Sequence, residues 1–316
     1  MNRPGRKVFF SIGTKDALLL AFFLAAFALL SVCAAEEAPM YIVNAWNYVD
    51  GSMDVSNGIP EEATGRLARI RSLGKLTVVS EPYFPPQEFI DESKTGQDRF
   101  VGADMELARL IAERMGVELE IVPLEFSEVL TSIADGKYDL AISALSFTSG
   151  RAAVMEMSKG YYFTDEQASC GLIIREENAG VIRQVEDLAE RDIVAQSGSL
   201  QETMAAENIP LYRKFRRLHT VSDVYDAVEA GQADVGIVDL ENARAYIENH
   251  PDCGLTIVPD VFFALQDQYK GDRVAAPKGE IALIYFVNGV IDEVLASGQY
   301  DRWFDQFARY DGASQQ

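Results

Sequence analysis

The chain has 316 residues, more than one ordinary domain, so its length favours two domains or two lobes. Its formal net charge of -21 argues against nucleic acid and anionic membrane surfaces as partners, because both repel an acidic protein. It has two His and three Cys, without C-x-x-C or H-x-x-x-H spacing, so neither a metal site nor a cofactor is predicted.

The first 35 residues are built like a secretory leader or an N-terminal anchor. Basic residues at positions 3, 6, 7 and 15 precede an uncharged apolar run from 17 to 32. Small residues around Cys33 are typical of a cleavage site, and Leu30-Ser31-Val32-Cys33 also looks like a lipoprotein box. We therefore expect an exported protein, periplasmic or on the cell surface, with the leader cleaved, lipidated at Cys33 or retained as a membrane anchor.

Residues 36–73 are predicted to form a tether that ends in a short helix. Residues 36–58 are polar and show no clear hydrophobic period. From Pro60 onward, acidic residues in the first turn and apolar residues at helical spacing predict a helix, which Gly74 ends.

Strands and helices alternate along the rest of the chain. The first series consists of strands over 76–80, 117–122 and 139–143 and helices over 104–115 and 126–135. A second series begins after Phe163, with strands over 171–174, 192–195 and 234–238 and helices over 185–190, 200–208, 221–230 and 241–248. Two further helices are expected over 280–296 and 300–310. This alternation predicts an α/β fold with doubly wound parallel sheets in two lobes.

Polar residues follow the predicted strand over 139–143, at the end where ligands sit in open α/β sheets. Among them are two hydroxyls, Ser146 and Thr148, and one guanidinium, Arg151. A guanidinium can hold a carboxylate through two parallel hydrogen bonds, although a solvated Arg on a surface loop would explain the same pattern.

Six motifs in the same order resemble the extracellular solute-binding proteins of family 3, the polar amino-acid receptors of bacterial ABC importers. They are Glu81–Phe89, Phe100–Asp104, Gly136–Asp139, Ser146-x-Thr148-x-x-Arg151, Gly198-Ser199-x-x-Glu202 and Gly236–Asp239. The resemblance spans Leu76 to Tyr310 and implies the type II periplasmic binding protein fold, two doubly wound α/β lobes with a double-crossover hinge. On this basis the first lobe comprises 74–165 and 278–312 and the second 166–277, with a ligand cleft between them.

The resemblance also implies how a free amino acid would be held. Its carboxylate would be bound by Arg151 and Thr148 and by backbone N–H groups at Ser199 and Leu200. Its ammonium would be bound by Asp239, the Ser146 hydroxyl and the Ala144 carbonyl. From spacing alone, Asp239 is equally well explained as the N-cap of the following helix.

Four residues are expected to line the pocket for the ligand's side chain: Glu81, Phe84, Gln87 and Phe126. Glu81 lies where relatives that take basic amino acids carry an acid, which favours a basic ligand, although a solvated loop Glu would explain it as well. Phe84 replaces the usual Tyr, and Gln87 replaces the usual Phe.

We therefore predict a monomeric binding protein, not an enzyme, that closes on a free amino acid and delivers it to an ABC transporter permease. One alternative is a cyclohexadienyl or arogenate dehydratase on the same fold, with Glu81 or Asp239 as general acid. Another is a ligand-sensing module, against which the chain end at Gln316 argues. Cys170 and Cys253 both fall in the second lobe, where a disulfide between them is geometrically possible.

Overall fold

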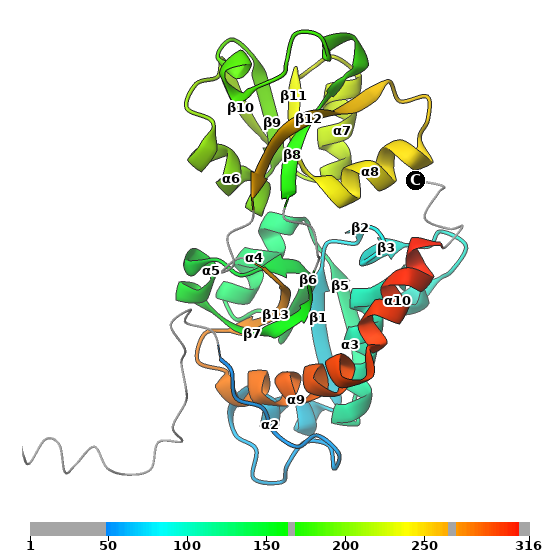
Figure 1. Ribbon diagram of the computed structural model, residues 1–316. Helices are drawn as coiled ribbons and strands as arrows, with labels where there is room; N and C mark the ends of the chain where they lie inside the picture. The colour runs from blue at the N-terminus through cyan, green and yellow to red at the C-terminus, as the bar shows by residue number, and fades with distance from the viewer. Residues whose placement is uncertain (1–48, 164–167, 265–269, 310–316) are drawn as a thin grey trace, which may run out of the picture. The chain divides into compact units, whose positions relative to one another are not determined.

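The computed structural model describes residues 49–163, 168–264 and 270–309, and Figure 1 shows their helices and strands. The predicted leader, Cys33 and residues 36–48 lie outside the described residues. Within these ranges no single helix is long and apolar enough to cross a membrane. The pair α9 (Ile281–Ser297) and α10 (Gln299–Ala308), bent by 74°, meets that test in length and composition when taken together.

The first lobe is built on a five-stranded mixed sheet in the order β5–β1–β6–β13–β7. Its strands are β1 (Lys75–Ser80), β5 (Glu118–Pro123), β6 (Leu140–Ser146), β7 (Met155–Tyr162) and β13 (Asp272–Pro277). β1 pairs in parallel with β5 and β6, with Val78 opposite both Ile121 and Leu140. β13 pairs antiparallel with β6 at the edge of this parallel unit, and β7 pairs antiparallel with β13.

Helices cover both faces of this sheet because its strands are apolar on both sides. Leu76 and Val78 pack with residues of α9 and α3 (Ala103–Met115), whereas Val79 packs with residues of α4 (Phe126–Ala134) and α5 (Ser149–Val154). α2 (Gly65–Leu73) lies beside α9 (Figure 1).

The second lobe contains another five-stranded sheet, in the order β10–β9–β11–β8–β12. Its strands are β8 (Ala168–Arg175), β9 (Asp192–Gln196), β10 (Lys214–Leu218), β11 (Val235–Asp239) and β12 (Leu255–Ala264). β9 is parallel to β10 and β11, whereas β8 is antiparallel to β11 and β12. α6 (Leu200–Asn208) packs on one face, and α7 (Val221–Glu229) and α8 (Leu240–Asn249) pack on the other.

The remaining elements are short. They are β2 (Tyr83–Phe84), β3 (Glu88–Ile90) and β4 (Phe100–Val101), which form a small antiparallel sheet, and the 3-10 helices Gly96–Arg99, Glu176–Asn178 and Val185–Leu188. The chain passes from the first sheet to the second after β7 and returns after β12. The predicted fold class is confirmed: two α/β lobes are joined by a double crossover.

Two predictions about the ends of the first lobe were wrong. β13 was expected in the second lobe, within 166–277, but it inserts between β6 and β7 of the first sheet. A five- or six-residue apolar strand fits either sheet, and only its non-local partners decide which. The predicted helix from Pro60 begins instead at Gly65, although it ends at Gly74 as expected.

The end of the predicted tether is also packed against the first lobe. The Val49 N–H donates to the Met157 carbonyl at 3.2 Å. The Asn288 side-chain amide, on α9, donates to the carbonyls of Val49 at 2.9 Å and Gly51 at 2.7 Å. Residues 49–73 are therefore part of the folded lobe rather than a free tether.

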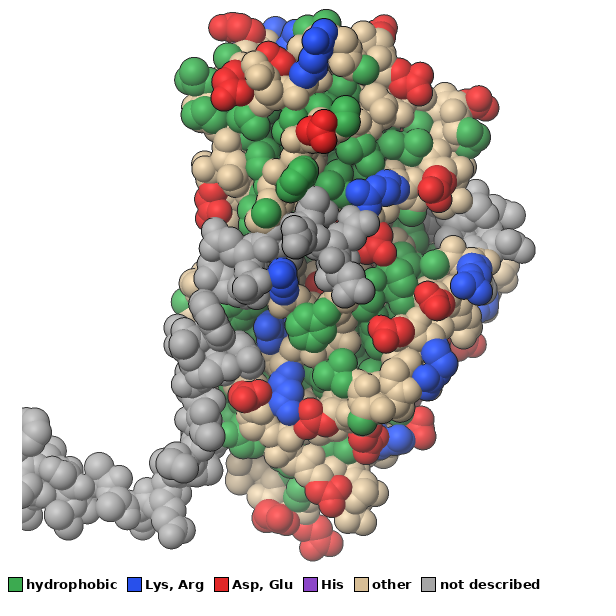
Figure 2. Space-filling model, viewed as in Figure 1, with side chains coloured by type: hydrophobic (Ala, Val, Ile, Leu, Met, Phe, Trp, Pro, Cys, Tyr) green, Lys and Arg blue, Asp and Glu red, His purple; other side chains and the backbone are tan. Residues whose placement is uncertain are grey.

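Acidic and basic side chains are interspersed over the visible face of the protein (Figure 2). Cys170 is buried on β8 and Cys253 is half-buried, and the two are not joined by the disulfide considered possible from the sequence.

Candidate functional site

Two adjoining cavities lie where residues of the two lobes meet. The smaller has a volume of about 50 Å³ and the larger about 260 Å³. They share the lining residues Phe84, Ala144, Ser146, Leu200 and Gln201. A ligand at these shared residues would therefore reach into both cavities.

Arg151 lines the smaller cavity and is positioned by the start of α5. Its backbone N–H donates to the Thr148 hydroxyl, which caps this helix. Its guanidinium donates to the carbonyl of Ser146 at 2.7 Å and to that of Gly198, in the second lobe, at 3.0 Å. The guanidinium also lies 5.4 Å from the centre of the Phe126 ring.

The charge of Arg151 is retained in this buried position. Burial lowers the pKa of its guanidinium to about 10, which still leaves it protonated at neutral pH. A guanidinium carries five N–H donors. The two hydrogen bonds that the described part of the chain accepts leave donors for an anionic ligand group, such as a carboxylate.

Glu81 and Gln196 form a second polar pair in the smaller cavity. The Gln196 side-chain amide, at the end of β9, donates to Glu81 Oε1 at 2.9 Å and so links the two lobes. The Glu81 backbone N–H donates to the Ser143 hydroxyl, which itself donates to Glu88 Oε1. Glu81 is only 2% exposed.

Burial raises the pKa of the Glu81 carboxyl to about 8, although the hydrogen bond from Gln196 opposes this shift. The charges of Asp223 and Glu125 act in the same direction as burial. Glu81 is therefore mostly protonated and neutral at pH 7.

Replacing Glu81 by Gln is expected to stabilise the protein above neutral pH. The folded state holds a proton on Glu81 between its ordinary pKa of 4.5 and about 8, and the unfolded chain does not. The stability of the wild type therefore falls as pH rises through this window, and a neutral Gln removes that contribution. We expect a gain on the order of 4 kcal/mol at pH 8 and no gain at pH 4, measured by urea unfolding. An equal effect at both pH values would contradict the assignment.

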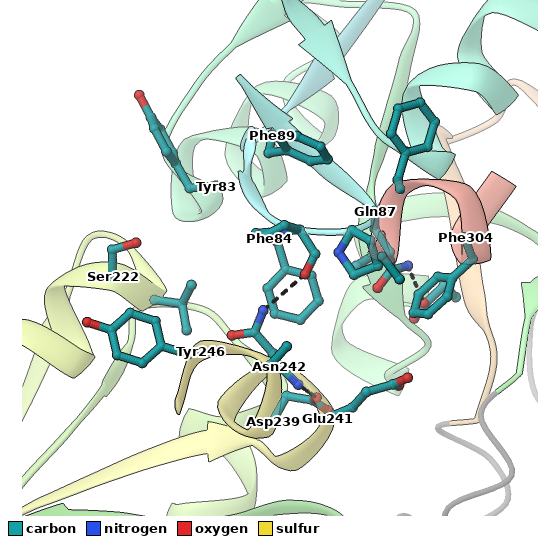
Figure 3. A pocket seen from close by; sticks show the side chains of 18 of the residues that line it. Tyr83, Phe84, Gln87, Phe89, Ser222, Asp239, Glu241, Asn242, Tyr246 and Phe304 are labelled. Carbon is teal, nitrogen blue, oxygen red and sulfur yellow. Dashed lines mark hydrogen bonds between the residues drawn. The ribbon is translucent and has the colours of Figure 1, made fainter. Parts of the chain in front are cut away.

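Asp239 lines the larger cavity at the end of β11 (Figure 3). Its carboxylate accepts from the Asn242 N–H at 3.0 Å, so the N-cap role is confirmed. The Asn242 side chain donates across the lobes to the Pro85 carbonyl at 3.3 Å and accepts from the Tyr225 hydroxyl at 2.6 Å. Glu241 lies beside Asp239 in the same wall (Figure 3).

Gln87 connects the larger cavity to a buried polar network. Its side-chain amide donates to Asp272 at 2.9 Å and to the Tyr300 hydroxyl at 3.2 Å. Tyr300 donates to Asp104, whose other oxygen accepts from the Ala144 N–H at 2.9 Å. This bond holds Ala144 at φ 45°, a conformation that is uncommon without glycine.

Asp272 has an unusual charge state within this network. Burial, reinforced by the charge of Asp104, raises the pKa of its carboxyl to about 7, although the Gln87 bond favours ionisation. Asp272 is therefore partly charged at neutral pH and gains charge as pH rises.

Ten of the eleven predicted site residues line one of the two cavities. Glu81, Phe126, Arg151 and Ser199 line the smaller, Gln87 and Asp239 the larger, and Phe84, Ala144, Ser146 and Leu200 both. Thr148 is missing from the described lining of either cavity, and its hydroxyl instead caps α5.

Sequence reasoning missed several polar lining residues. They are Ser143, Glu88, Gln196 and Gln201 in the smaller cavity and Gln201, Ser222, Glu241, Asn242, Asn249, His250 and Asp272 in the larger. Gln196 carried a usable signal because it directly follows a predicted strand, the one over 192–195, as the residues before Arg151 follow the strand over 139–143. The described residues contain no group of three or more His, Cys, Asp or Glu arranged to hold a metal ion.

A family model matches most of the chain. The model of the bacterial extracellular solute-binding proteins, family 3, covers residues 76–309. These limits run from β1 to just beyond α10 and include every residue that lines either cavity.

The individual relatives include amino-acid-binding proteins and one enzyme. The arginine-binding extracellular protein ArtP of Bacillus subtilis is 28% identical over 187 residues, which are 59% of this chain and 69% of ArtP. The substrate-binding protein AbpA of Streptococcus pneumoniae, solved bound to L-arginine, has a TM-score of 0.68 and 34% identity, covering 79% of this chain and 99% of that one. A cyclohexadienyl dehydratase of Pseudomonas aeruginosa is 25% identical over 187 residues, 59% of this chain and 67% of the enzyme.

Proposed function

Because the chain belongs to the bacterial extracellular solute-binding proteins of family 3, we propose that it captures a free amino acid outside the cytoplasm and presents it to an ABC transporter permease. One observation carries this proposal: the buried guanidinium of Arg151 lines one cavity, and the carboxylate of Asp239 lines the adjoining one. A zwitterion at the shared lining residues would meet opposite charges at its two ends.

The two lobes would hold such a ligand together. Arg151 comes from the first lobe, and the helix that begins at Leu200 comes from the second, so its first N–H groups add donors for the carboxylate. Asp239, with the Ala144 carbonyl and the Ser146 hydroxyl, takes the ammonium. Since these groups meet only when the lobes touch, binding favours the closed form that a permease would recognise.

We further propose a basic side chain, arginine above all. Glu81 and Gln196 lie in the smaller cavity with Arg151, where the ligand's side chain would extend. A guanidinium or ammonium beside Glu81 would favour the ionised carboxylate, whereas an acidic ligand would be repelled. ArtP and AbpA, the arginine-binding relatives, support this assignment.

Binding of L-arginine is expected to release a proton near neutral pH. Free Glu81, with its pKa of about 8, is protonated, and a bound cation would ionise it. Arginine affinity should therefore rise as pH rises from 6 to 8, by up to about tenfold per pH unit, and then level off. Isothermal titration calorimetry in phosphate and in Tris counts the released proton.

Glu81→Gln is the matched control for this experiment. It should bind arginine at least about tenfold more weakly at pH 8, without proton release, while L-glutamine affinity changes little.

A thermal-shift screen of the proteinogenic amino acids tests the function itself, since a ligand of the native state raises the melting temperature. No shift with any amino acid would refute the proposal.

One observation favours dehydratase activity as a second candidate. A protonated carboxyl, that of Glu81, lies in the same cavity as Arg151, so a ring acid held by the guanidinium would lie near a proton donor. The cyclohexadienyl dehydratase relative is consistent with this candidate. Incubation with prephenate or arogenate, followed by chromatography of the products, separates the two functions.

A further inference from the structure

We propose that the larger cavity is a second subsite, which takes the N-terminal residue of a dipeptide whose C-terminal residue occupies the amino-acid position. The protein would then bind short peptides with a free ammonium group as well as free amino acids. This inference rests on the proposed function, because it uses Arg151 as the group that holds the C-terminal carboxylate.

The first argument is where the space lies. Arg151 and Glu81 line only the smaller cavity, of about 50 Å³, and Asp239 lines only the larger, of about 260 Å³. A single amino acid held between Arg151 and Asp239 does not fit in the smaller cavity of about 50 Å³, so it would also fill the part of the larger cavity beside the shared lining residues. The rest of the larger cavity remains beyond the ligand's nitrogen, which is where a peptide continues.

This space is not simply a gap between lobes that have moved apart. The hydrogen bond from Asn242 to the Pro85 carbonyl crosses between the lobes in the wall of the larger cavity, at 3.3 Å. Two further cross-lobe bonds, Arg151 to Gly198 and Gln196 to Glu81, involve residues at the smaller cavity. The larger volume thus remains although the lobes touch at both cavities.

The second argument is the chemistry of the walls. Aromatic side chains from both lobes face the cavity, among them Tyr83, Phe84, Tyr162, Tyr246 and Phe304. Three carboxyl groups accompany them, those of Asp239, Glu241 and Asp272, and the described lining includes no Lys or Arg.

These walls suit a cation attached to an apolar body, since carboxylates attract an ammonium and aromatic faces add to that attraction. A ligand extended from its nitrogen by an anionic group would be repelled. The side chains of Gln87, Ser222 and Asn242 add partners for the polar groups of a peptide bond (Figure 3).

A dipeptide matches both the space and the charges. Each added residue extends a chain by about 3.8 Å between Cα atoms, which carries the ammonium away from Arg151 and deeper into the larger cavity. At the former ammonium position, the peptide N–H can donate to Asp239. The displaced ammonium then lies among the remaining carboxyl groups, and the first side chain packs against the aromatic walls.

The test compares L-arginine, Ala-Arg, Tyr-Arg and Nα-acetyl-arginine by isothermal titration calorimetry. Both dipeptides are expected to bind within about tenfold of free arginine. Nα-acetyl-arginine has no ammonium and should bind at least about tenfold more weakly than Ala-Arg, because it loses a hydrogen-bonded charge.

Two variants locate the subsite. Ala245→Trp fills the larger cavity and should weaken Tyr-Arg binding at least about tenfold while changing arginine affinity less than about threefold. Glu241→Gln should weaken Ala-Arg more than Nα-acetyl-arginine. Glu248→Trp is the matched control, because it places the same indole at an exposed position of the same helix outside the described lining.

The outcomes separate the two proposals. Arginine binding that requires Arg151, with no binding of either dipeptide, would overturn the peptide subsite and leave the proposed function intact. Dipeptide binding that Ala245→Trp and Glu248→Trp affect equally would also overturn it. If neither amino acids nor dipeptides bind, the proposed function fails as well.

Discussion

Arg151→Ala is expected to abolish amino-acid binding, with a loss of at least about a hundredfold in affinity. Arg151 is 8% exposed and lines the smaller cavity, so removal of its guanidinium would leave a bound carboxylate buried without a counter-charge. Losing one partner of a buried, hydrogen-bonded charge pair costs about 2–5 kcal/mol. Titration calorimetry with L-arginine measures this loss.

Controls are needed because Arg151 also donates to carbonyls in both lobes. Arg151→Lys keeps the charge but loses the paired donors, so we expect an affinity between those of the wild type and Arg151→Ala. Thr148→Val removes the cap of α5 and should cost about 1 kcal/mol of stability, with a smaller effect on binding. Circular dichroism shows whether each variant is folded. A folded Arg151→Ala protein with wild-type affinity would rule out the assigned role.

Asp139→Ala is expected to destabilise the first lobe by about 3–5 kcal/mol, because it leaves buried partners without their shared acceptor. The Asp139 carboxylate is 2% exposed. It accepts from the Thr77 N–H and hydroxyl and forms ion pairs with Arg66 and Arg69 at 3.1 and 2.9 Å. Urea unfolding of the variant and the wild type measures the change in the free energy of unfolding.

Arg69→Ala is the matched control for this prediction. The Arg69 side chain is 55% exposed, so its ion pair should contribute no more than about 1 kcal/mol. Equal destabilisation by the two substitutions would show that the Asp139 network contributes little. A large difference would show that the network holds α2, which lies outside the family match, against the sheet whose strand β6 leads into Arg151.

Local patterns predicted those parts of the fold in which a strand is followed by a helix. The helices over Leu200–Asn208 and Val221–Glu229 begin where the sequence indicates, because Ser199 and Thr220 cap them. The strands β7, β10 and β12 were not predicted. β10, with the sequence Lys-Phe-Arg-Arg-Leu, has too few apolar residues to stand out. β7 and β12 pair antiparallel with β13 and β8, which are distant in the sequence, so no local strand–helix–strand unit marks them.

The site was predictable to the extent that it lies at strand ends. Arg151, Ser199 and Asp239 each follow or end a strand, and the motif order assigned them together. Gln196 and Asp272 were missed because their importance depends on contacts with residues 115 and 185 positions away, Glu81 and Gln87. No local pattern reports such contacts or the burial that raises the pKa values of the buried carboxyl groups.

The position of β13 has a consequence for the order of folding. This strand lies between β6 and β7, more than a hundred residues earlier in the chain, so the first sheet remains incomplete until residue 277 has emerged. The second sheet is contiguous from β8 to β12 and has no such requirement. We therefore expect the second lobe to acquire its native structure first during synthesis. The first lobe can complete its sheet only after β13 has been synthesised.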